Sequence, residues 1–168
     1  IVLDLMDTVS IEQGRLTLSL VPTDLASLLR SLEKDYNAHP GSRKNQLTLH
    51  LANTLPEISA DPERLIQVVS NLISNAERHT HGGTITVSLS GTPGWQTICV
   101  SDTGPGMSEK MRQNALKGYV SADKDYWRHG IGLYVCHQIV TAHGGKIWIE
   151  SKEGEGTRVF FSLPEVIK

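Results

Sequence analysis

Residues 61–80 carry the clearest structural pattern in the chain. Asp61 is a favoured helix N-cap, Pro62 suits the first helical turn, and Glu63 places an acidic group where the helix dipole favours one. The apolar residues that follow recur with the helical period and form one stripe, made of Leu65, Val68, Val69, Leu72 and Ala76. The pattern predicts an amphipathic helix from residue 61 to about residue 80, with this stripe in the core.

A stripe of polar side chains borders the apolar one. It consists of Gln67, Asn71, Asn75 and Arg78, at successive spacings of four, four and three residues. Asn has a mediocre helix propensity, so two of them one turn apart indicate a binding role. A carboxamide oxygen is a suitable ligand for Mg²⁺, which stays partly hydrated and bridges to nucleotide phosphates. The alternative, that both Asn side chains simply lie on the solvated side of the helix, stays open at this point.

The other patterns predict an α+β fold. Alternating residues at 16–20 and 46–51 read as strands, and Pro22, Thr23 and Asp24 start a helix with apolar positions at a helical period. A hairpin is expected from residues 84–90 and 95–100 around a Gly and Pro turn, followed by a helix at 132–143. Strands at 146–151 and 157–163 complete a sheet that packs on helices, rather than an alternating βαβ arrangement.

Composition excludes several classes of protein. The 168 residues include 16 Lys and Arg against 18 Asp and Glu, a net charge of −2, which disfavours nucleic-acid binding. Cys99 and Cys136 have no metal-binding spacing and are expected to be buried thiols in a reducing compartment. No apolar run approaches the roughly 18 residues of a membrane span, and no signal peptide is recognisable. We therefore expect a soluble, cytoplasmic chain without membrane contact.

Two glycine-containing segments are further candidates for binding. Asp102 directly follows a predicted strand and precedes Gly104 and Gly106; its carboxylate can accept from an exocyclic amine, while the glycines allow backbone to approach a flat ring. Gly130 and Gly132 open the predicted helix 132–143, where backbone N–H groups can face phosphates. Between them lies a long irregular stretch with one short expected helix at 108–116. Each glycine segment is also compatible with an ordinary turn.

The order of these three signals resembles the ATP-binding domain of sensor histidine kinases, within the GHKL ATPase superfamily. Residues 71–76 resemble the family's N box, 102–106 its first glycine box and 130–133 its second. Residues 143–151, 156–157 and 161–164 resemble its closing helix and strands. The resemblance implies a two-layer sandwich of a mixed sheet on helices over residues 15–168, with a lid at about 107–129. Residues 1–14 would be the end of a dimerisation helix.

The resemblance also implies roles for individual residues. Asn75 would bind Mg²⁺, and Asn71 and Arg78 would lie at the phosphates and act with it in catalysis. Asp102 would bind the adenine amine, and Thr157 would join a water network beneath it. The other nucleotide-binding positions implied by the resemblance are His79, Gly104, Gly106, Met107, Tyr119, Gly130, Gly132 and Leu133.

Three departures from the family pattern concern the lid and the substrate. Where the family has Phe-x-Pro-Phe, this chain has Leu116, Lys117, Gly118 and Tyr119, so only one aromatic remains. Arg128 stands where the second glycine box commonly begins, so Arg128 or Lys124 could reach the phosphates instead. The acceptor histidine of the family is expected upstream of residue 1.

His79 and His81 also suggest a metal pair, but the sequence supplies no third ligand.

The expected function is transfer of the ATP γ-phosphoryl group to a histidine on an upstream dimerisation helix. The expected partners are this phosphoacceptor module, a response regulator receiver domain and a second copy of the intact kinase, which could be anchored in the inner membrane. Two alternatives remain. One is a GHKL ATPase, although hydrolytic members have a glutamate where Asn71 stands, and an amide cannot act as a general base. The other is a nucleotide-binding scaffold or sensor with little transfer activity.

Overall fold

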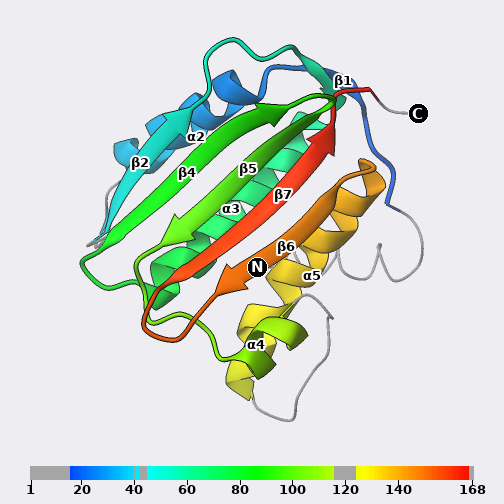
Figure 1. Ribbon diagram of the computed structural model, residues 1–168. Helices are drawn as coiled ribbons and strands as arrows, with labels where there is room; N and C mark the ends of the chain where they lie inside the picture. The colour runs from blue at the N-terminus through cyan, green and yellow to red at the C-terminus, as the bar shows by residue number, and fades with distance from the viewer. Residues whose placement is uncertain (1–15, 40, 42–44, 116–123, 167–168) are drawn as a thin grey trace.

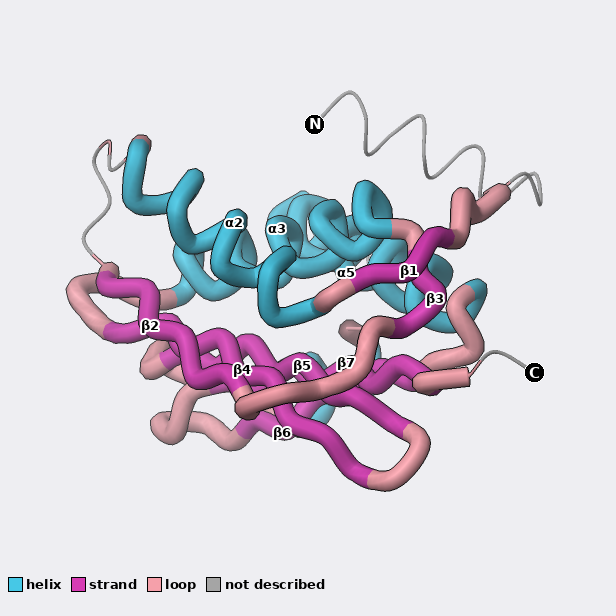
Figure 2. Tube along the Cα trace, turned by 90° about the horizontal axis from the view of Figure 1, so that it is seen from above, coloured by secondary structure: helices cyan, strands magenta, loops and turns pink. Residues whose placement is uncertain are grey.

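The computed structural model describes residues 16–39, 41, 45–115 and 124–166 and contains a five-stranded mixed sheet. The sheet order is β2 (Gln46–Leu51), β4 (Thr84–Thr92), β5 (Trp95–Asp102), β7 (Thr157–Pro164) and β6 (Lys146–Ser151). The β2–β4 pair is parallel and the other three pairs are antiparallel. Helices α2 (Leu25–Ala38), α3 (Pro62–His79) and α5 (Lys124–Ala142) cover one face (Figures 1 and 2). The predicted two-layer α+β sandwich is therefore confirmed.

Helix α3 forms as its sequence predicts. The Asp61 carboxylate accepts from the Arg64 N–H at 3.2 Å, Pro62 is the first helical residue, and the helix ends at His79. The expected apolar stripe is buried together with Ile73, and Leu65, Val68 and Val69 are fully inaccessible. Burying a side chain of this size stabilises a fold by roughly 1.5–3 kcal/mol, so the stripe fixes α3 firmly on the sheet. The polar stripe, including Asn71 and Asn75, is thereby fixed as well.

The prediction of a strand at residues 16–20 is wrong. The first strand is β1 (Val21–Thr23), which pairs antiparallel with a short strand that the sequence did not reveal, β3 (Ile58–Ala60). Only these three residues find a partner, and the Ser19 N–H instead donates to the Asp61 carboxylate at 2.9 Å. Alternation without a neighbouring strand does not make a strand. The consequence is that the incoming chain is tied to the start of α3.

Helix α5 begins earlier than expected. The predicted start was residue 132, but the helix runs from Lys124, so Gly130 and Gly132 lie inside it instead of at its N-terminus. Residues 124–129 contain neither Gly nor Pro and can therefore continue the helix. A glycine in a helix interior costs about 0.5–1 kcal/mol relative to Ala, which the helix tolerates. In the described conformation these glycines do not form a helix-capping phosphate loop.

Other expectations agree with the structure. Cys99 and Cys136 are buried free thiols, and the short helix expected at 108–116 is α4 (Glu109–Asn114). The open face of the sheet, opposite the helices, carries the stacked rings of Trp148 and Phe160, with centroids 5.2 Å apart. Within the described ranges, no helix combines the length and apolar character needed to cross a membrane. Residues 1–14, the expected dimerisation helix, lie outside the described residues.

Candidate functional site

Three polar side chains stand in a row at one end of the sheet. Asp102 ends β5, Thr157 begins β7 and Ser151 ends β6, and the strand register pairs Asp102 with Thr157 and Thr157 with Ser151. Directly paired residues place their side chains on the same face of a sheet, about 5 Å apart at Cβ. This is the face that the helices cover, because Val100 and Val159, two residues away, are buried in the core. The row is therefore a polar edge of the hydrophobic core.

The Asp102 carboxylate is held by backbone donors. Its Oδ1 accepts from the Gly104 N–H at 2.9 Å, and the Thr157 N–H also donates to the carboxylate. Burial raises the pKa of Asp102 above its usual value, while these hydrogen bonds and the nearby His79 act in the opposite direction. A half-buried carboxylate fixed in this way is an acceptor aimed at a defined place, as binding an amine requires.

Glycine is required where the loop after Asp102 meets the β6–β7 turn. Gly106 has φ +75°, and a Cβ there would lie 2.1 Å from the Lys152 carbonyl oxygen. Gly156 has φ +80°, and its Cβ would lie 2.2 Å from the Asp102 carbonyl oxygen. The Gly154 N–H also donates to the Pro105 carbonyl at 2.7 Å. The first predicted glycine box is thus a closely packed floor and not a free turn.

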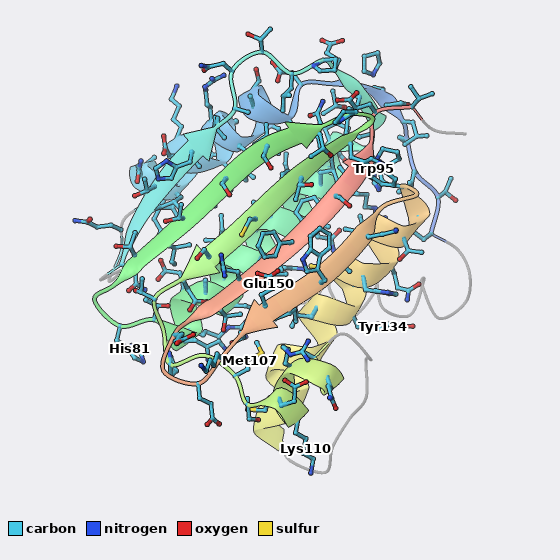
Figure 3. All side chains as sticks on the ribbon, viewed as in Figure 1. His81, Trp95, Met107, Lys110, Tyr134 and Glu150 are labelled. Atoms are coloured by element: carbon cyan, nitrogen blue, oxygen red, sulfur yellow. The ribbon has the colours of Figure 1, made fainter. Side chains whose placement is uncertain are left out.

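Met107 directly follows Gly106 and lies at the end of the sheet (Figure 3). Its backbone N–H donates to the Ser151 hydroxyl at 2.7 Å. The Ser151 hydroxyl in turn donates to the Gly156 carbonyl at 3.0 Å and lies 2.9 Å from the Thr157 hydroxyl. Ser151 therefore connects the loop, the turn and the polar row. The sequence interpretation placed Ser151 only in a closing strand; the signal that it missed is the register with Thr157.

The C-terminal half of α3 contributes the carboxamides. Asn71 and Asn75 are half-buried, and neither Nδ2 atom has a hydrogen-bond partner among the described residues. The Asn75 Oδ1 accepts from the Arg78 guanidinium at 2.6 Å, and Arg78 also donates to the Ser74 carbonyl at 3.4 Å. Leaving a buried polar atom unpaired costs about 1–3 kcal/mol. Two such atoms one turn apart point to a bound ligand, and they argue against the solvated-side interpretation.

The end of α3 lies against the Asp102 loop. A Cβ at Gly104 would lie 2.6 Å from the His79 carbonyl oxygen, so only glycine permits this approach. Asn45 fixes the end of α3 from the other side: its Nδ2 donates to the Thr80 carbonyl at 2.8 Å and its Oδ1 accepts from Gly83 at 3.0 Å. Arg78 and His79 are thereby brought to the same end of the molecule as Asp102, and Asn75 and Asn71 lie about one and two helical turns before them.

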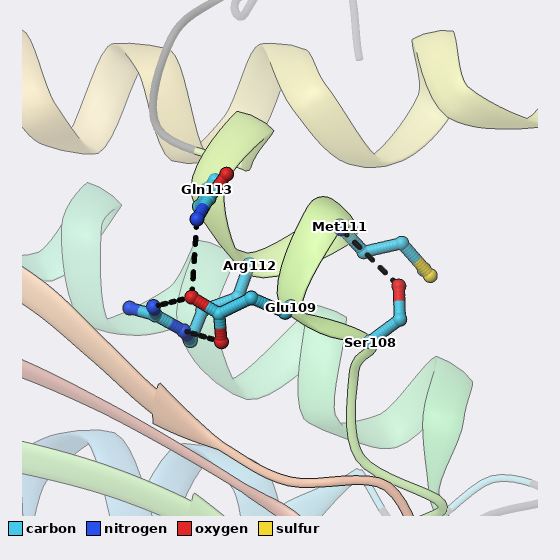
Figure 4. A network of polar contacts seen from close by, with 5 residues as sticks. All are labelled: Ser108, Glu109, Met111, Arg112 and Gln113. Carbon is cyan, nitrogen blue, oxygen red and sulfur yellow. Dashed lines mark hydrogen bonds and ion pairs between the residues drawn. The ribbon is translucent and has the colours of Figure 1, made fainter.

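The expected lid is only partly described. Helix α4 lies at its start and is stabilised by its own side chains (Figure 4). The Ser108 hydroxyl accepts from the Met111 N–H, and the Glu109 carboxylate forms an ion pair with Arg112 and accepts from the Gln113 side chain. Tyr119 lies outside the described residues. Leu133 is buried in the core, where it can shape a site only through packing. Within the described ranges, no group of three or more His, Cys, Asp and Glu side chains could hold a metal ion.

A separate groove of ≈ 520 Å³ lies between α2 and α3. Its lining includes Tyr36, Glu77 and Arg78, and the Tyr36 hydroxyl donates to the Glu77 carboxylate. Of the predicted site residues only Arg78 belongs to its lining. The lining of the groove therefore includes neither the two carboxamides nor Asp102.

Similarity to known proteins identifies the family of this chain. The model of the family described as "Histidine kinase-, DNA gyrase B-, and HSP90-like ATPase" matches residues 60–167. The chain belongs to this ATPase family. The matched range contains the Asn-rich helix, both glycine boxes and the Thr157 strand, so the resemblance seen in the sequence is confirmed.

Several curated proteins that this chain resembles are sensory kinases. The chain is 33% identical over 165 residues to the adaptive-response sensory kinase SasA of Synechococcus sp. (strain JA-3-3Ab), covering 96% of this chain and 44% of that protein. It is 38% identical over 141 residues to SasA of Synechococcus elongatus, covering 82% of this chain and 36% of the relative. The chain thus spans less than half of the length of these relatives.

Solved structures agree in fold. Full-length ShkA in complex with AMPPNP matches with a TM-score of 0.85 and 26% identity, over 98% of this chain and 35% of ShkA. The Acinetobacter baumannii histidine kinase AdeS matches with a TM-score of 0.77 and 23% identity, over 99% of this chain and 77% of AdeS. These structures share the sandwich of a mixed sheet covered by helices.

Proposed function

We propose that the chain is the catalytic ATP-binding domain of a sensor histidine kinase. In this proposal it binds Mg²⁺ and ATP and transfers the γ-phosphoryl group to a histidine on a dimerisation helix upstream of the domain. The observation that carries the proposal is the pair of unpartnered carboxamide nitrogens of Asn71 and Asn75 on α3, the helix whose last residue lies against the loop after the fixed Asp102 carboxylate. Family membership and the similarity to SasA and ShkA support it.

The purine end of ATP is assigned to the polar row and the glycine floor. The Asp102 carboxylate accepts from the amino group of the base, and Thr157 lies beside it. Gly104 and Gly106 let the loop after Asp102 pack directly on the His79 and Lys152 carbonyls, because a side chain at either position would collide with backbone. Met107, which follows the floor directly, borders the same pocket.

The phosphate end is assigned to the polar stripe of α3. Arg78 supplies a permanent positive charge, and Asn71 and Asn75 supply amide groups whose Nδ2 atoms have no partner in the described part of the chain. The donor set fits Mg²⁺, since an amide oxygen from Asn75 and phosphate oxygens are the hard ligands that this ion prefers. When bound, Mg²⁺ offsets the negative charge that develops on the transferred phosphoryl group. Arg78 must then release the Asn75 oxygen and is free to contact a phosphate.

Phosphoryl transfer to a protein, and not to water, is favoured by the chemistry of Asn71. An amide neither accepts a proton at neutral pH nor activates a water molecule. Catalysis then depends on holding ATP in line with an incoming nucleophile and on stabilising charge, which suits this donor set. In this proposal the lid expected at about residues 107–129, of which the structure describes 107–115 and 124–129, excludes water from the transferred group.

The partners follow from the same proposal. They are the dimerisation module that carries the acceptor histidine, a response regulator receiver domain, and a second copy of the intact kinase in the cytoplasm. A histidine kinase of similar fold, ThkA, has been solved in complex with the response regulator TrrA, with a TM-score of 0.77 and 22% identity. That complex supports a receiver domain as the partner of this chain.

The proposal is tested by calorimetry of ADP and AMPPNP binding with and without Mg²⁺. Asn75→Ala is expected to weaken Mg²⁺-dependent binding by at least about tenfold, because it removes a ligand to the ion. Gln67→Ala is the matched control: Gln67 is a carboxamide on the same stripe, but its Oε1 already accepts from Arg64 at 3.1 Å. The proposal is refuted if the wild type binds no nucleotide, or if both variants weaken binding equally.

Phosphate release distinguishes a kinase from an ATPase. With ATP and Mg²⁺, the wild type is expected to release phosphate no faster than Asp102→Ala, which removes the acceptor for the base. Rapid release by the wild type would instead support the ATPase alternative.

A further inference from the structure

The Ser151 hydroxyl has every hydrogen-bonding position filled. It accepts from the Met107 N–H at 2.7 Å, and it lies 3.0 Å from the Gly156 carbonyl and 2.9 Å from the Thr157 hydroxyl. A carbonyl oxygen only accepts, so Ser151 gives its single proton to Gly156. The contact with Thr157 must then run the other way, with the Thr157 hydroxyl donating to Ser151.

This assignment fixes the chemical character of Thr157. A hydroxyl has one proton, and that of Thr157 is used within the protein. What Thr157 offers a ligand is therefore a lone pair. Its register partner Asp102 also offers only lone pairs when ionised, since its own bonds are all to N–H groups. Two neighbouring acceptors match a ligand edge that carries donors, such as the 6-amino group of a purine, and oppose a 6-oxo group.

We propose that Ser151 is a positioning residue that sets base specificity by fixing the Thr157 hydroxyl as an acceptor toward the nucleotide. The inference rests on the proposed nucleotide binding and deepens it, because it names a 6-aminopurine as the preferred base and Ser151 as a cause of the preference. Ser151 does not touch the base itself. Without it, the Thr157 hydroxyl rotates and can donate to a 6-oxo group.

The test compares ADP with inosine diphosphate, which replaces the 6-amino group by a 6-oxo group and adds a proton to the neighbouring ring nitrogen. Calorimetry in Mg²⁺ gives the affinity of each for the wild type, Ser151→Ala and Ser151→Thr. We expect the preference for ADP to fall by about tenfold in Ser151→Ala, the factor that corresponds to one hydrogen bond of about 1.4 kcal/mol. Ser151→Thr retains a hydroxyl and is expected to restore most of the preference.

A purely structural role of Ser151 would give a different result. Loss of the Met107 contact alone would loosen the loop and weaken both nucleotides equally, leaving their ratio unchanged. Ser101→Ala is a suitable control, because Ser101 is the neighbour of Asp102 on β5 and its side chain lies on the opposite face. It is expected to leave the ratio at the wild-type value.

A double-mutant cycle with Thr157→Val isolates the mechanism. Val has no hydroxyl to orient, so Ser151→Ala is expected to leave the ratio of affinities unchanged in the Thr157→Val background. The inference is overturned if Ser151→Ala changes the ratio equally in both backgrounds, or leaves it unchanged in the wild-type background. Failure of the wild type to bind either nucleotide would refute the proposed function instead, so the two failures are distinguishable. Circular dichroism of each variant confirms that it is folded.

Discussion

Substitution of Gly106 by Ala tests whether the glycine floor is built by close packing. Gly106 has φ +75°, and its added Cβ would lie 2.1 Å from the Lys152 carbonyl oxygen and 3.1 Å from the Gly156 carbonyl oxygen. Both are backbone atoms, so no side chain can rotate away. The β6–β7 turn must therefore move off the loop that follows Asp102.

The cost has two parts. An L-residue in the left-handed region costs about 1–2 kcal/mol. Moving the turn also breaks the hydrogen bonds from Gly154 to Pro105 and from Met107 to Ser151, both 2.7 Å long. Each contributes about 0.5–1.5 kcal/mol net, so the total loss is about 2–5 kcal/mol. Gly94 and Gly154 both have φ +83° and nothing within 4 Å of an added Cβ, so their Ala variants should lose only the first part.

Urea unfolding of the three variants measures this difference directly. Gly106→Ala is expected to be less stable than Gly94→Ala and Gly154→Ala by at least about 1 kcal/mol. Its ADP affinity should also fall by more than about tenfold, because the floor of the base pocket has moved. Equal stabilities for all three variants, or full ADP affinity in Gly106→Ala, would refute the packing that we describe.

Two further predictions concern Asp102 and His143. Burial raises the Asp102 pKa above 3.8, and only the ionised carboxylate is a pure acceptor. As the solution is acidified, ADP affinity is therefore expected to fall at a higher pH than it would with an Asp of ordinary pKa. By linkage, a raised pKa contributes stability that is fully present below pH 3.8 and is lost as the pH rises through the raised pKa. Asp102→Asn is therefore expected to be at least as stable as the wild type at pH 7 and to lose ADP binding. A clear loss of stability in this variant would contradict the prediction. The buried His143 donates from Nδ1 to the Ile139 carbonyl at 2.8 Å and accepts at Nε2 from the Asp61 N–H at 3.0 Å, so His143→Leu should cost about 1–3 kcal/mol in urea unfolding. The exposed His50→Leu is its control, and equal effects would show that the Asp61 contact contributes nothing.

Much of the fold could be predicted from local pattern. The N-cap at Asp61, the apolar stripe of α3, and the paired strands β6 and β7 depend on neighbouring residues and period, and the structure places them as expected. Strand β3 could not be predicted, because its three residues are a strand only through pairing with Val21–Thr23. Helix α5 begins at Lys124 and not at residue 132, because Gly130 and Gly132 suggest a boundary that the preceding residues override.

The candidate site was predictable by residue type but not by connection. Asn71 and Asn75 stand out because Asn is not a residue that a helix favours, and Asp102 stands out because a carboxylate directly follows a strand. The approach of Gly104 to His79, and the link from Met107 through Ser151 to Thr157, depend on residues distant in sequence meeting across strands and loops. Ser151 was missed for this reason, since an isolated serine at a strand end carries no signal of its own.

The most direct test of the account is where a nucleotide binds. Two-dimensional ¹H–¹⁵N NMR of the chain, titrated with ADP and Mg²⁺, reports on side-chain amides and backbone N–H groups together. The account predicts that the side-chain amides of Asn71 and Asn75 shift together with the backbone signals of Gly104 and Gly106. Shifts confined to the α2–α3 groove, at residues such as Tyr36 and Glu77, or no shifts at all, would contradict it.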